Sequence, residues 1–330
     1  FQAKEENGYL YGRGTADMKS HVICLLYAAE QLVKGGWQPK NDIWFALSSD
    51  EEVRGGSMAR MVRILQSEGV QPAFVLDEGG FVSAPYAMQQ QVAAVVGTGE
   101  NGVLLFTLTC DDDNAMEKLT RGAARLSRLR FQAKLHPAMK QTLLKMAPLL
   151  SRWDGLMMKQ LCLTTPFVLR RLKGTSMGSA MVKTRLWLKV MQGQVMGDNR
   201  PALTYQASIP HGGSAEVLLM RIHRRIRRLN LRLHIDHCDE PSRLSPDEGE
   251  AYEALETAIR VHFPGVLPLP GPIAGGTDSR RFESICRNIY RFSPFSMTVE
   301  DLSRIHHTDE RIRIEDLPLA ASFFSQMLQA

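Results

Sequence analysis

The amino-acid sequence predicts an α/β fold, and three observations support this prediction. Short apolar runs, such as residues 43–47 and 73–76, have the length of buried strands. Segments with apolar residues at helical spacing, such as residues 21–32, lie between these runs. The chain has 330 residues, of which 44% are hydrophobic and 23% charged, which is ordinary for a globular protein of one large domain or two smaller ones.

Bulk properties exclude several classes of protein. A formal net charge of +5 is modest for this length and does not by itself indicate a nucleic-acid partner. The five scattered cysteines include no Cys-x-x-Cys pair, so we expect neither a disulfide framework nor a thiolate zinc site. No apolar run reaches about 18 residues, so no membrane-spanning helix is expected.

The chain begins without an initiator Met or a signal peptide, which suggests a fragment or a processed chain. A cytoplasmic location is favoured only by default, and a preceding signal or anchor stays open.

A glycine-rich motif, GRGTADMK at 12–19, opens the chain. Residues 9–11 are predicted to form a strand before it, and residues 21–32 a helix after it that ends at a Gly-Gly pair. Asp17 is therefore expected in a loop just before a helix, where the helix dipole favours a carboxylate. The simpler alternative is that Asp17 only caps the helix.

Acidic residues follow two successive predicted strands. The first strand leads into Glu51 and Glu52, before a helix predicted over about 57–67, and the second leads into Asp77 and Glu78. Ligands of open α/β sheets bind beyond the carboxyl ends of the strands, so acids at these positions suit a metal site. A solvated acidic turn would explain one such strand end, but not two strand ends together with a glycine-rich loop that carries an aspartate.

The middle of the chain changes in composition. The glycine-rich residues 97–102, between predicted strands at 89–96 and 103–109, suggest a hinge or a crossover between domains. Residues from about 116 to 172 are rich in Leu, Met, Lys and Arg and are expected to be mostly helical. Residues 181–210 then alternate as strands do, with breaks at glycine and proline.

Two clusters in the next segment are expected to have structural roles. Residues 214–230 are predicted to form an amphipathic helix with Ser214 as its N-cap, and the polar face carries five arginines. These arginines could bind phosphates, but a solvated helix face is the simpler interpretation, and no aromatic residues stand between them. His234, Asp236 and His237 look like metal ligands, but strand alternation places His237 on the opposite face from the other two.

The α/β pattern resumes at Ser245. Residues 268–272, which contain three prolines, are expected to form a turn rather than a strand. The predicted elements in this part are a helix at 248–263, the motif GGTDSR at 275–280, a strand at 288–292, the motif RIHHTDE at 304–310 and a final helix at 317–328.

The acids and one histidine together fit a two-metal centre. Two divalent metals about 3.5–4 Å apart require a bridging carboxylate and terminal carboxylate and imidazole ligands. Zinc accepts both oxygen and nitrogen ligands. Glu51, which stands beside a ligand, could take the proton from the attacking water. The ligands would be Asp17, Glu52, Glu78 and His306.

The motifs GRGTADMK, DEE, LDEG, GTDSR and HHTDE follow one another in an order that resembles the di-zinc superfamily of aminoacylase, carboxypeptidase S and glutamate carboxypeptidase. The sequences IYRFSP at 289–294 and EDL at 300–302 resemble the branch of carboxypeptidase S and N-fatty-acyl-amino-acid synthase/hydrolase. The resemblance implies a zinc-exopeptidase-like catalytic domain, a mixed sheet flanked by helices, with an inserted smaller α/β lid domain. The catalytic domain would comprise residues 1–98 and 239–330, and the lid residues 99–238.

The resemblance also implies a role for each matching residue. Asp17 matches the aspartate that bridges two zinc ions, and Glu51 matches the general acid/base. Glu52 and Glu78 match the carboxylate ligands, one for each zinc, and His306 matches the ligand histidine. His307 and Asp77 are the second choices for a histidine and a carboxylate ligand. The implied substrate-binding residues are Asn199 (or Asp198), Gly276, Thr277, Asp278 and Arg280.

Three features of the family are absent from the sequence. The family's first zinc histidine lies upstream of the point where this chain begins, so one zinc would lack a protein ligand. Residues 110–114 stand where the family has a lid histidine, and residues 206–211 stand where it has an arginine for the substrate carboxylate. His211 could replace some of the lost function, although a role in a surface loop is the simpler expectation.

The sequence therefore predicts a zinc-dependent hydrolase with two Zn²⁺ ions per complete chain. It would cleave an amide bond next to a free carboxylate, in a small peptide or an N-acyl amino acid, and could form a homodimer. Neither a nucleic-acid partner nor a membrane span is expected. The alternative hypothesis is a truncated or catalytically inactive family member that acts as a binding or interaction protein.

Overall fold

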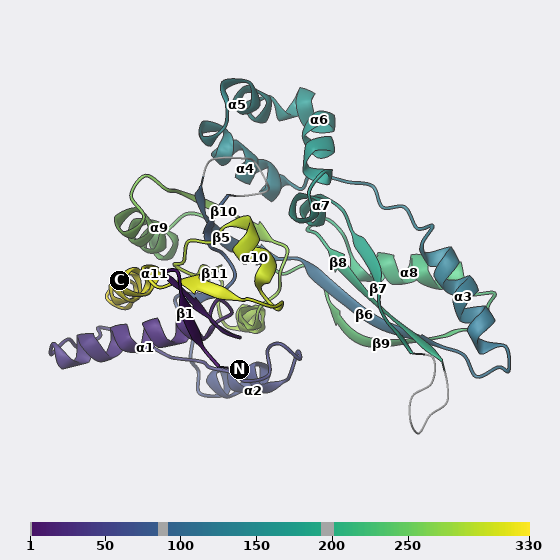
Figure 1. The fold of residues 1–330 in the computed structure, drawn as a ribbon, viewed down its shortest axis with the longest axis horizontal. Coiled ribbons are helices and arrows are strands. Elements are labelled where there is room, and N and C mark those ends of the chain that lie inside the picture. Colours follow the sequence, from purple (N-terminus) through teal and green to yellow (C-terminus); the bar gives the residue numbers. More distant parts are fainter. Residues whose placement is uncertain (1, 85–91, 193–200) are drawn as a thin grey trace.

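Sheets of five, four and three strands organise the chain in the computed structural model, which describes residues 2–84, 92–192 and 201–330 (Figure 1). The five-stranded sheet has the order β10-β5-β11-β3, with β4 paired to β5, and mixes parallel and antiparallel pairs. This mixed α/β architecture agrees with the predicted fold class. The strands are β3 (Val75–Asp77), β4 (Val82–Ser83), β5 (Ala93–Glu100), β10 (Leu267–Ile273) and β11 (Ile289–Arg291).

Helices cover the five-stranded sheet because their apolar stripes pack on its strands. Three helices share one hydrophobic core with β5 and β11, and a second, smaller core joins α2 to the short helix η3. The helices predicted at 21–32, 57–67, 248–263 and 317–328 are confirmed, whereas η3 was not predicted. The observed bounds are α1 (Lys19–Lys34), α2 (Ser57–Ser67), α9 (Glu250–His262), η3 (Asp278–Ser284) and α11 (Asp316–Leu328).

Strand β10 corrects the prediction of a turn over residues 268–272. Among the described strands it pairs only with β5, in parallel, and it therefore forms an edge of the sheet. Its three prolines alternate along the strand, so all three can face the unpaired side, where no N–H is needed for the ladder. On that side the Pro270 carbonyl accepts a hydrogen bond of 2.9 Å from the Thr142 hydroxyl. Proline therefore did not exclude a strand here.

The predicted buried strand at residues 43–47 is wrong. These residues form no strand, and Trp44 and Leu47 are about half exposed, at 54% and 49%. An apolar run becomes a strand only when a neighbouring strand accepts its backbone hydrogen bonds. In the part of the chain that the structure describes, no strand pairs with this run.

The glycine-rich residues 97–102 are not a loose hinge. β5 continues through Glu100, and the next strand begins at Gly102, so the chain passes from one sheet into the other in extended conformation. A Cβ atom on Gly97 would lie 3.0 Å from the Cβ of Arg291, and one on Gly99 would lie 2.8 Å from Leu244. The glycines therefore permit close packing at this crossover.

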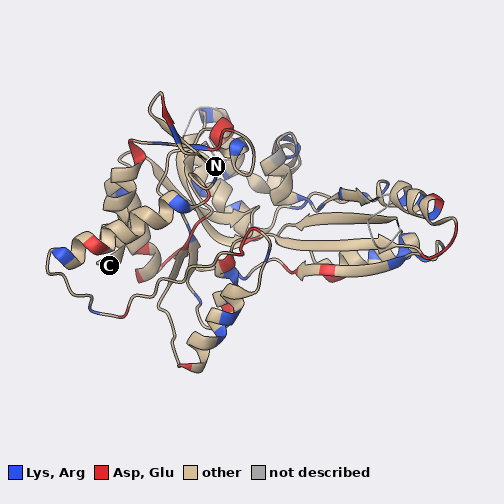
Figure 2. Ribbon diagram, turned by 60° about the horizontal axis from the view of Figure 1, so that its bottom comes forward, with Lys and Arg blue, Asp and Glu red and all other residues tan. Residues whose placement is uncertain are grey.

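The four-stranded sheet extends from the body of the molecule as an arm (Figures 1 and 2). It is antiparallel, with the order β7-β8-β6-β9, and two helices pack together on it around a separate core. Ser214 caps the second helix, as predicted, and its hydroxyl accepts the Val217 N–H. The elements are β6 (Gly102–Thr109), α3 (Ala115–Leu126), β7 (Arg185–Gln192), β8 (Ala202–Ile209), α8 (Ala215–Ile226) and β9 (Arg232–Asp239).

A group of helices between β6 and β7 does not belong to the arm. These helices form a core of their own that includes Ala93 of β5 and Leu269 of β10, so they cover the edge of the five-stranded sheet. The predicted helical character of residues 116–172 is confirmed. The boundaries 1–98, 99–238 and 239–330 stay a prediction. The helices are α4 (Pro137–Met146), η2 (Ala147–Leu149), α5 (Arg152–Lys159), α6 (Leu161–Lys173) and α7 (Ser176–Val182).

A small three-stranded sheet joins the two ends of the chain. Its central strand, β2 (Tyr9–Tyr11), pairs with β1 (Lys4–Glu6) and with β12 (Arg311–Arg313). Helix α10 (Val299–Arg304) precedes β12, so the loop after α10 lies beside the loop that follows β2. Among the described residues, no helix has the length and apolarity needed to cross a membrane.

Candidate metal centre

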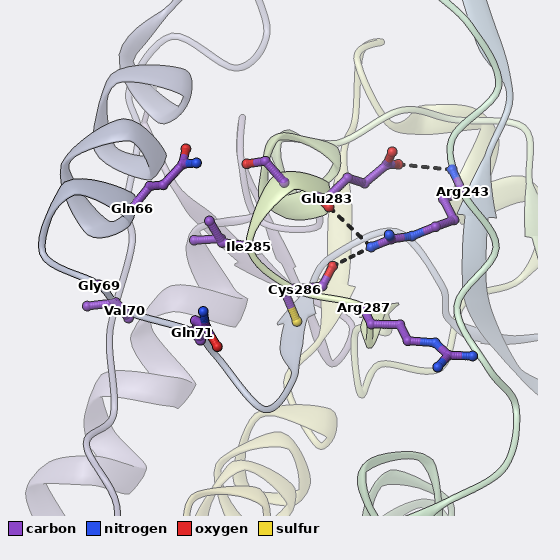
Figure 3. A pocket seen from close by; sticks show the side chains of 10 residues that line it. Gln66, Gly69, Val70, Gln71, Arg243, Glu283, Ile285, Cys286 and Arg287 are labelled. Atoms are coloured by element: carbon purple, nitrogen blue, oxygen red, sulfur yellow. Dashed lines mark hydrogen bonds between the residues drawn. The ribbon is translucent and has the colours of Figure 1, made fainter.

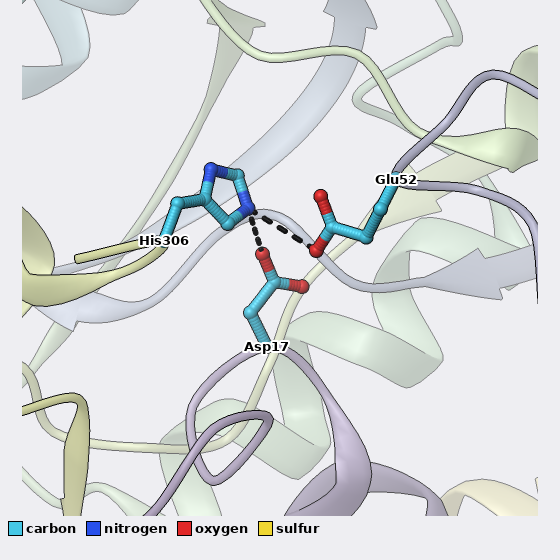
Figure 4. Close-up of side chains that lie close together, drawn as sticks. All are labelled: Asp17, Glu52 and His306. Carbon is cyan, nitrogen blue, oxygen red and sulfur yellow. Dashed lines mark hydrogen bonds and ion pairs between the residues drawn. The ribbon is translucent and has the colours of Figure 1, made fainter. Parts of the chain in front are cut away.

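Three predicted ligands converge where these two loops meet the acidic segment 50–52 (Figure 4). The Nε2 atom of His306 lies 2.8 Å from an oxygen of Asp17 and 3.2 Å from an oxygen of Glu52. One possible ligand atom from each residue lies within 4.8 Å of the other two. Asp17 and His306 are 289 positions apart in the sequence, so the fold alone brings them together.

The loop of Asp17 is held by a buried glutamate. Glu310 is 3% exposed, and one of its carboxylate oxygens accepts the backbone N–H groups of Gly14, Ala16 and Asp17 at 2.9, 3.0 and 3.2 Å. Its other oxygen pairs with Arg13 at 2.6 Å. Gly14 has φ +86°, a conformation that favours glycine. The carboxylate therefore fixes the backbone that presents Asp17.

Asp17 does not cap α1. The helix begins at Lys19, and no side chain caps its N-terminus. The capping alternative for Asp17 is therefore wrong, and its carboxylate is available to the cluster.

The sequence analysis assigned no role to Glu310. The signal was present, because Glu310 closes the HHTDE motif four positions after His306. His306 itself has φ +65°, which is unusual for a residue with a side chain. The loop between α10 and β12 thus supplies one predicted ligand and the residue that positions another.

Glu51 lies in a partly buried and strongly acidic environment. Burial is the main cause that raises its pKa to about 7, and the nearby carboxylates of Glu52, Asp278, Asp17 and Asp77 raise it further. A carboxyl group with a pKa near neutrality can both accept and return a proton at physiological pH. Its environment therefore suits the predicted acid/base role.

Glu78 is hydrogen-bonded to Asp17, but it is not one of the three residues at ligand spacing. Burial, its hydrogen bond with Asp17 and the neighbouring carboxylates together raise the pKa of Glu78 to about 11. Asp77, the second choice at this position, instead accepts the Ser279 N–H at 3.0 Å. The contact with Asp17 favours Glu78 over Asp77 as a ligand.

The donor set fits a divalent metal. Several carboxylates and an imidazole stand together, and the charge of unpaired neighbouring acids is unfavourable until a cation offsets it. Oxygen and nitrogen donors in this combination suit zinc, although they also suit other divalent ions.

The predicted substrate-binding residues of the 276–280 loop divide into two groups. Asp278 faces the acidic site, where its carboxylate accepts the Ser48 hydroxyl at 2.6 Å, and burial raises its pKa. Thr277 and Arg280 instead contact residues at the crossover between the sheets. The Thr277 hydroxyl donates to Glu100 at 2.9 Å, and Arg280 donates to the Glu240 carbonyl at 2.6 Å.

Gly276 borders the same crossover, since a Cβ on it would lie 3.6 Å from Glu100. Asn199 and its alternative Asp198 lie outside the described residues. The Nε2–H of His211 donates a 2.9 Å hydrogen bond to the Ser242 carbonyl, and burial is the main cause that lowers the pKa of His211 to about 4. The His234 cluster does not bring its histidines to one point, and among the described residues only the Asp17 group has metal-ligand spacing.

A cavity of about 380 Å³ lies apart from the acidic cluster (Figure 3). The end of α2, η3 and Arg243 line it, and Arg243 donates hydrogen bonds to the carbonyls of Glu283 and Cys286. None of the predicted ligands borders this cavity. The candidate metal centre is instead an open cluster, with Glu52 and His306 more than half exposed at 58% and 59%.

Comparison with known proteins gives consistent results. The family model described as peptidase family M20/M25/M40 matches residues 1–330. The chain is 30% identical to N-fatty-acyl-amino acid synthase/hydrolase PM20D1 of Xenopus tropicalis, over all of this chain and 68% of that protein. It is 24% identical to probable carboxypeptidase S-like 2 of Dictyostelium discoideum, over all of this chain and 67% of that protein.

Solved structures share the fold. The M20 family metallo-carboxypeptidase Sso-CP2 from Sulfolobus solfataricus superimposes with a TM-score of 0.71 at 13% identity, over 99% of this chain and 78% of that one. The di-peptidase Dug1p from Saccharomyces cerevisiae superimposes with a TM-score of 0.70 at 12% identity, over 99% of this chain and 74% of that one.

Proposed function

The chain belongs to peptidase family M20/M25/M40 and is a metallopeptidase-type hydrolase, and we propose that it cleaves an amide bond next to a free carboxylate with the help of two bound zinc ions. The observation that carries the proposal is the convergence of Asp17, Glu52 and His306 from three distant segments. An inactive relative would have no need to hold two carboxylates and an imidazole at ligand distance.

We assign the metal ligands by contact. Asp17 would be the ligand shared by the two ions, because it contacts both His306 and Glu78. Glu52 and His306 would bind one ion, and Glu78 the other. Bound divalent ions would supply Lewis-acid polarisation of the scissile carbonyl and lower the pKa of a water molecule.

Glu51 would perform the proton transfers. Burial and the neighbouring carboxylates raise the pKa of Glu51 and so favour uptake of the proton of the attacking water. The same carboxyl, once protonated, would donate that proton to the leaving amine as the C–N bond breaks. Its partial burial keeps it in a site where bulk water competes less for the proton.

The substrate class follows from the relatives. N-fatty-acyl-amino acid synthase/hydrolase, carboxypeptidase S-like and dipeptidase are the names of the similar proteins, and the first two name substrates or activities in which an amide neighbours a carboxylate. We therefore propose N-acyl amino acids and small peptides as substrates.

The test combines metal content with turnover. Purified wild-type protein is measured for zinc by elemental analysis and for hydrolysis of a panel of N-acyl amino acids and dipeptides. Glu51→Gln should lower kcat by about two orders of magnitude or more with unchanged zinc content. Glu68→Gln, an exposed change at the end of α2, is the matched control. A wild-type protein without zinc and without turnover would instead support a binding role.

A further inference from the structure

The outer faces of α5 and α6 carry exposed apolar side chains. On α5, Trp153 and Leu156 stand one turn apart and are 77% and 51% exposed. On α6, Leu163 and Phe167 stand one turn apart and are 79% and 52% exposed. Both helices bury the opposite face in their own core. Figure 1 shows α5 and α6 at the outer edge of the molecule, away from α1 and α2. Large side chains in such a position usually mark a contact surface.

Basic residues flank these apolar side chains. Arg152 and Lys159 stand at the two ends of α5, and Arg170 and Lys173 follow Phe167 along α6. None of these four residues forms an ion pair with another described residue. All of them are exposed.

The charge of this region differs from that of the whole chain. Residues 137–173 contain seven Lys and Arg but one acidic residue, whereas the chain has 40 Lys and Arg and 35 Asp and Glu. The single acid, Asp154, is paired with Arg171. An apolar centre with unpaired basic residues around it is the pattern of a helix that lies in the headgroup region of a membrane.

We propose that the outer faces of α5 and α6 form a docking surface for an anionic lipid membrane. Trp153, Leu163 and Phe167 would enter the boundary between headgroups and acyl chains, where aromatic residues are favoured. Arg152, Lys159, Arg170 and Lys173 would contact the lipid phosphates and carboxylates. In this arrangement the docked helices lie on the bilayer, and no helix among the described residues has the length and apolarity to cross it.

Charge argues against a second copy of the chain as the occupant. A two-fold contact through this surface would place the same patch on both sides and bring like charges together. An anionic lipid surface instead complements the basic residues and accepts the apolar ones. Membrane docking does not rest on the proposed function. The benefit of docking for catalysis does rest on it, because a fatty-acyl substrate partitions into membranes and docking would bring the enzyme to that substrate.

Vesicle sedimentation tests the proposal. Wild-type protein should pellet with vesicles of phosphatidylcholine and phosphatidylserine and only weakly with phosphatidylcholine alone, and added salt should weaken the binding. The double variant Leu163→Asp with Phe167→Asp should bind at least about tenfold more weakly. Val261→Asp with Val299→Asp is the matched control, since both valines are 60% exposed on other helices. Arg170→Gln and Lys173→Gln should each weaken binding roughly fivefold.

Fluorescence gives a second readout that needs no disruptive variant. Lipids brominated in the acyl chain should quench wild-type tryptophan emission, and Trp153→Phe should remove most of that quenching. The proposal is overturned if the wild type fails to prefer anionic vesicles, or if the double variant binds as the wild type does. It is also overturned if the wild type is a dimer that the double variant dissociates, because the patch is then an interface between copies. Each readout is independent of hydrolysis.

Discussion

Replacing Glu310 with Gln should weaken both the fold and metal binding, although Glu310 touches no metal in the proposed arrangement. Its carboxylate accepts three backbone N–H groups of the Asp17 loop and pairs with Arg13. Gln has the same shape, so its amide oxygen can still accept the three N–H groups. Its NH₂ group, however, would then face the guanidinium of Arg13 without a lone pair to offer.

The magnitude follows from the contacts that are lost. A hydrogen bond to a charged group contributes about 1.5–3 kcal/mol to stability. Because Arg13 is 42% exposed, solvent screening places its pair with Glu310 near the lower end. The three remaining bonds lose their charge assistance, so we expect the free energy of unfolding to fall by about 2–3 kcal/mol. Outer-shell changes of this kind typically lower metal affinity about 10–100-fold.

The assay is a zinc titration in competition with a chromophoric chelator, together with urea unfolding of the metal-free protein. Glu315→Gln is the control, since Glu315 is exposed and its ion pair is with the neighbouring Arg313. Glu310→Ala should lower the free energy of unfolding more than Glu310→Gln does, because it leaves the three N–H groups of the loop without an acceptor. If Glu310→Gln binds zinc as tightly as the wild type, the carboxylate does not position Asp17 and the reasoning fails.

Three further predictions concern other buried groups. Glu78→Gln should lower the zinc content per chain, whereas Asp77→Asn, whose amide oxygen can still accept the Ser279 N–H, should leave the zinc content unchanged; the reverse result would make Asp77 the ligand. Burial lowers the pKa of His21 from 6.5 to about 4, so between these pH values the unfolded chain binds more protons than the folded chain. The free energy of unfolding should therefore fall by about 1.4 kcal/mol per pH unit as the pH drops through that window. His21→Asn should flatten the loss between pH 6.5 and 5 in urea unfolding, and an unchanged slope would exclude His21 as its source. Glu100→Gln should lower the free energy of unfolding, measured in urea, by about 3–5 kcal/mol, because it leaves the fully buried Arg291 guanidinium without its charge partner. Adding Arg291→Met should recover part of this loss, and no recovery would contradict the pairing.

Local patterns predicted most helices of this fold but not every strand. The apolar periodicity that predicts α1, α2 and α8 is contained in short stretches of sequence. The predicted bounds of these helices were therefore close to the observed ones. Strand formation depends on partners far away in the chain. The run 43–47 looked like a strand but has no described partner, and β10 looked like a turn but has β5 beside it.

The candidate site required more than local pattern. Asp17 and His306 could be assigned to one centre from the sequence only through the resemblance to a family, because no spacing rule connects residues 289 positions apart. The environment of Arg280 was not predictable either. Its guanidinium is 10% exposed and faces Glu100, Asp239 and Glu240, which depend on how the two sheets meet. The acid/base assignment of Glu51 stays a prediction supported by its surroundings.

The prolines of β10 have a consequence for aggregation. An open sheet edge is a template on which a strand of another molecule can add, and its unpaired N–H groups drive that addition. Proline at 268, 270 and 272 removes the N–H groups that these positions would otherwise present at this edge, and α4 lies against it. Strand β7, an edge of the arm, has no proline and exposes Trp187 and Met191. The two sheets therefore differ in how they meet other molecules: the five-stranded sheet resists growth at β10, whereas the arm can be extended at β7.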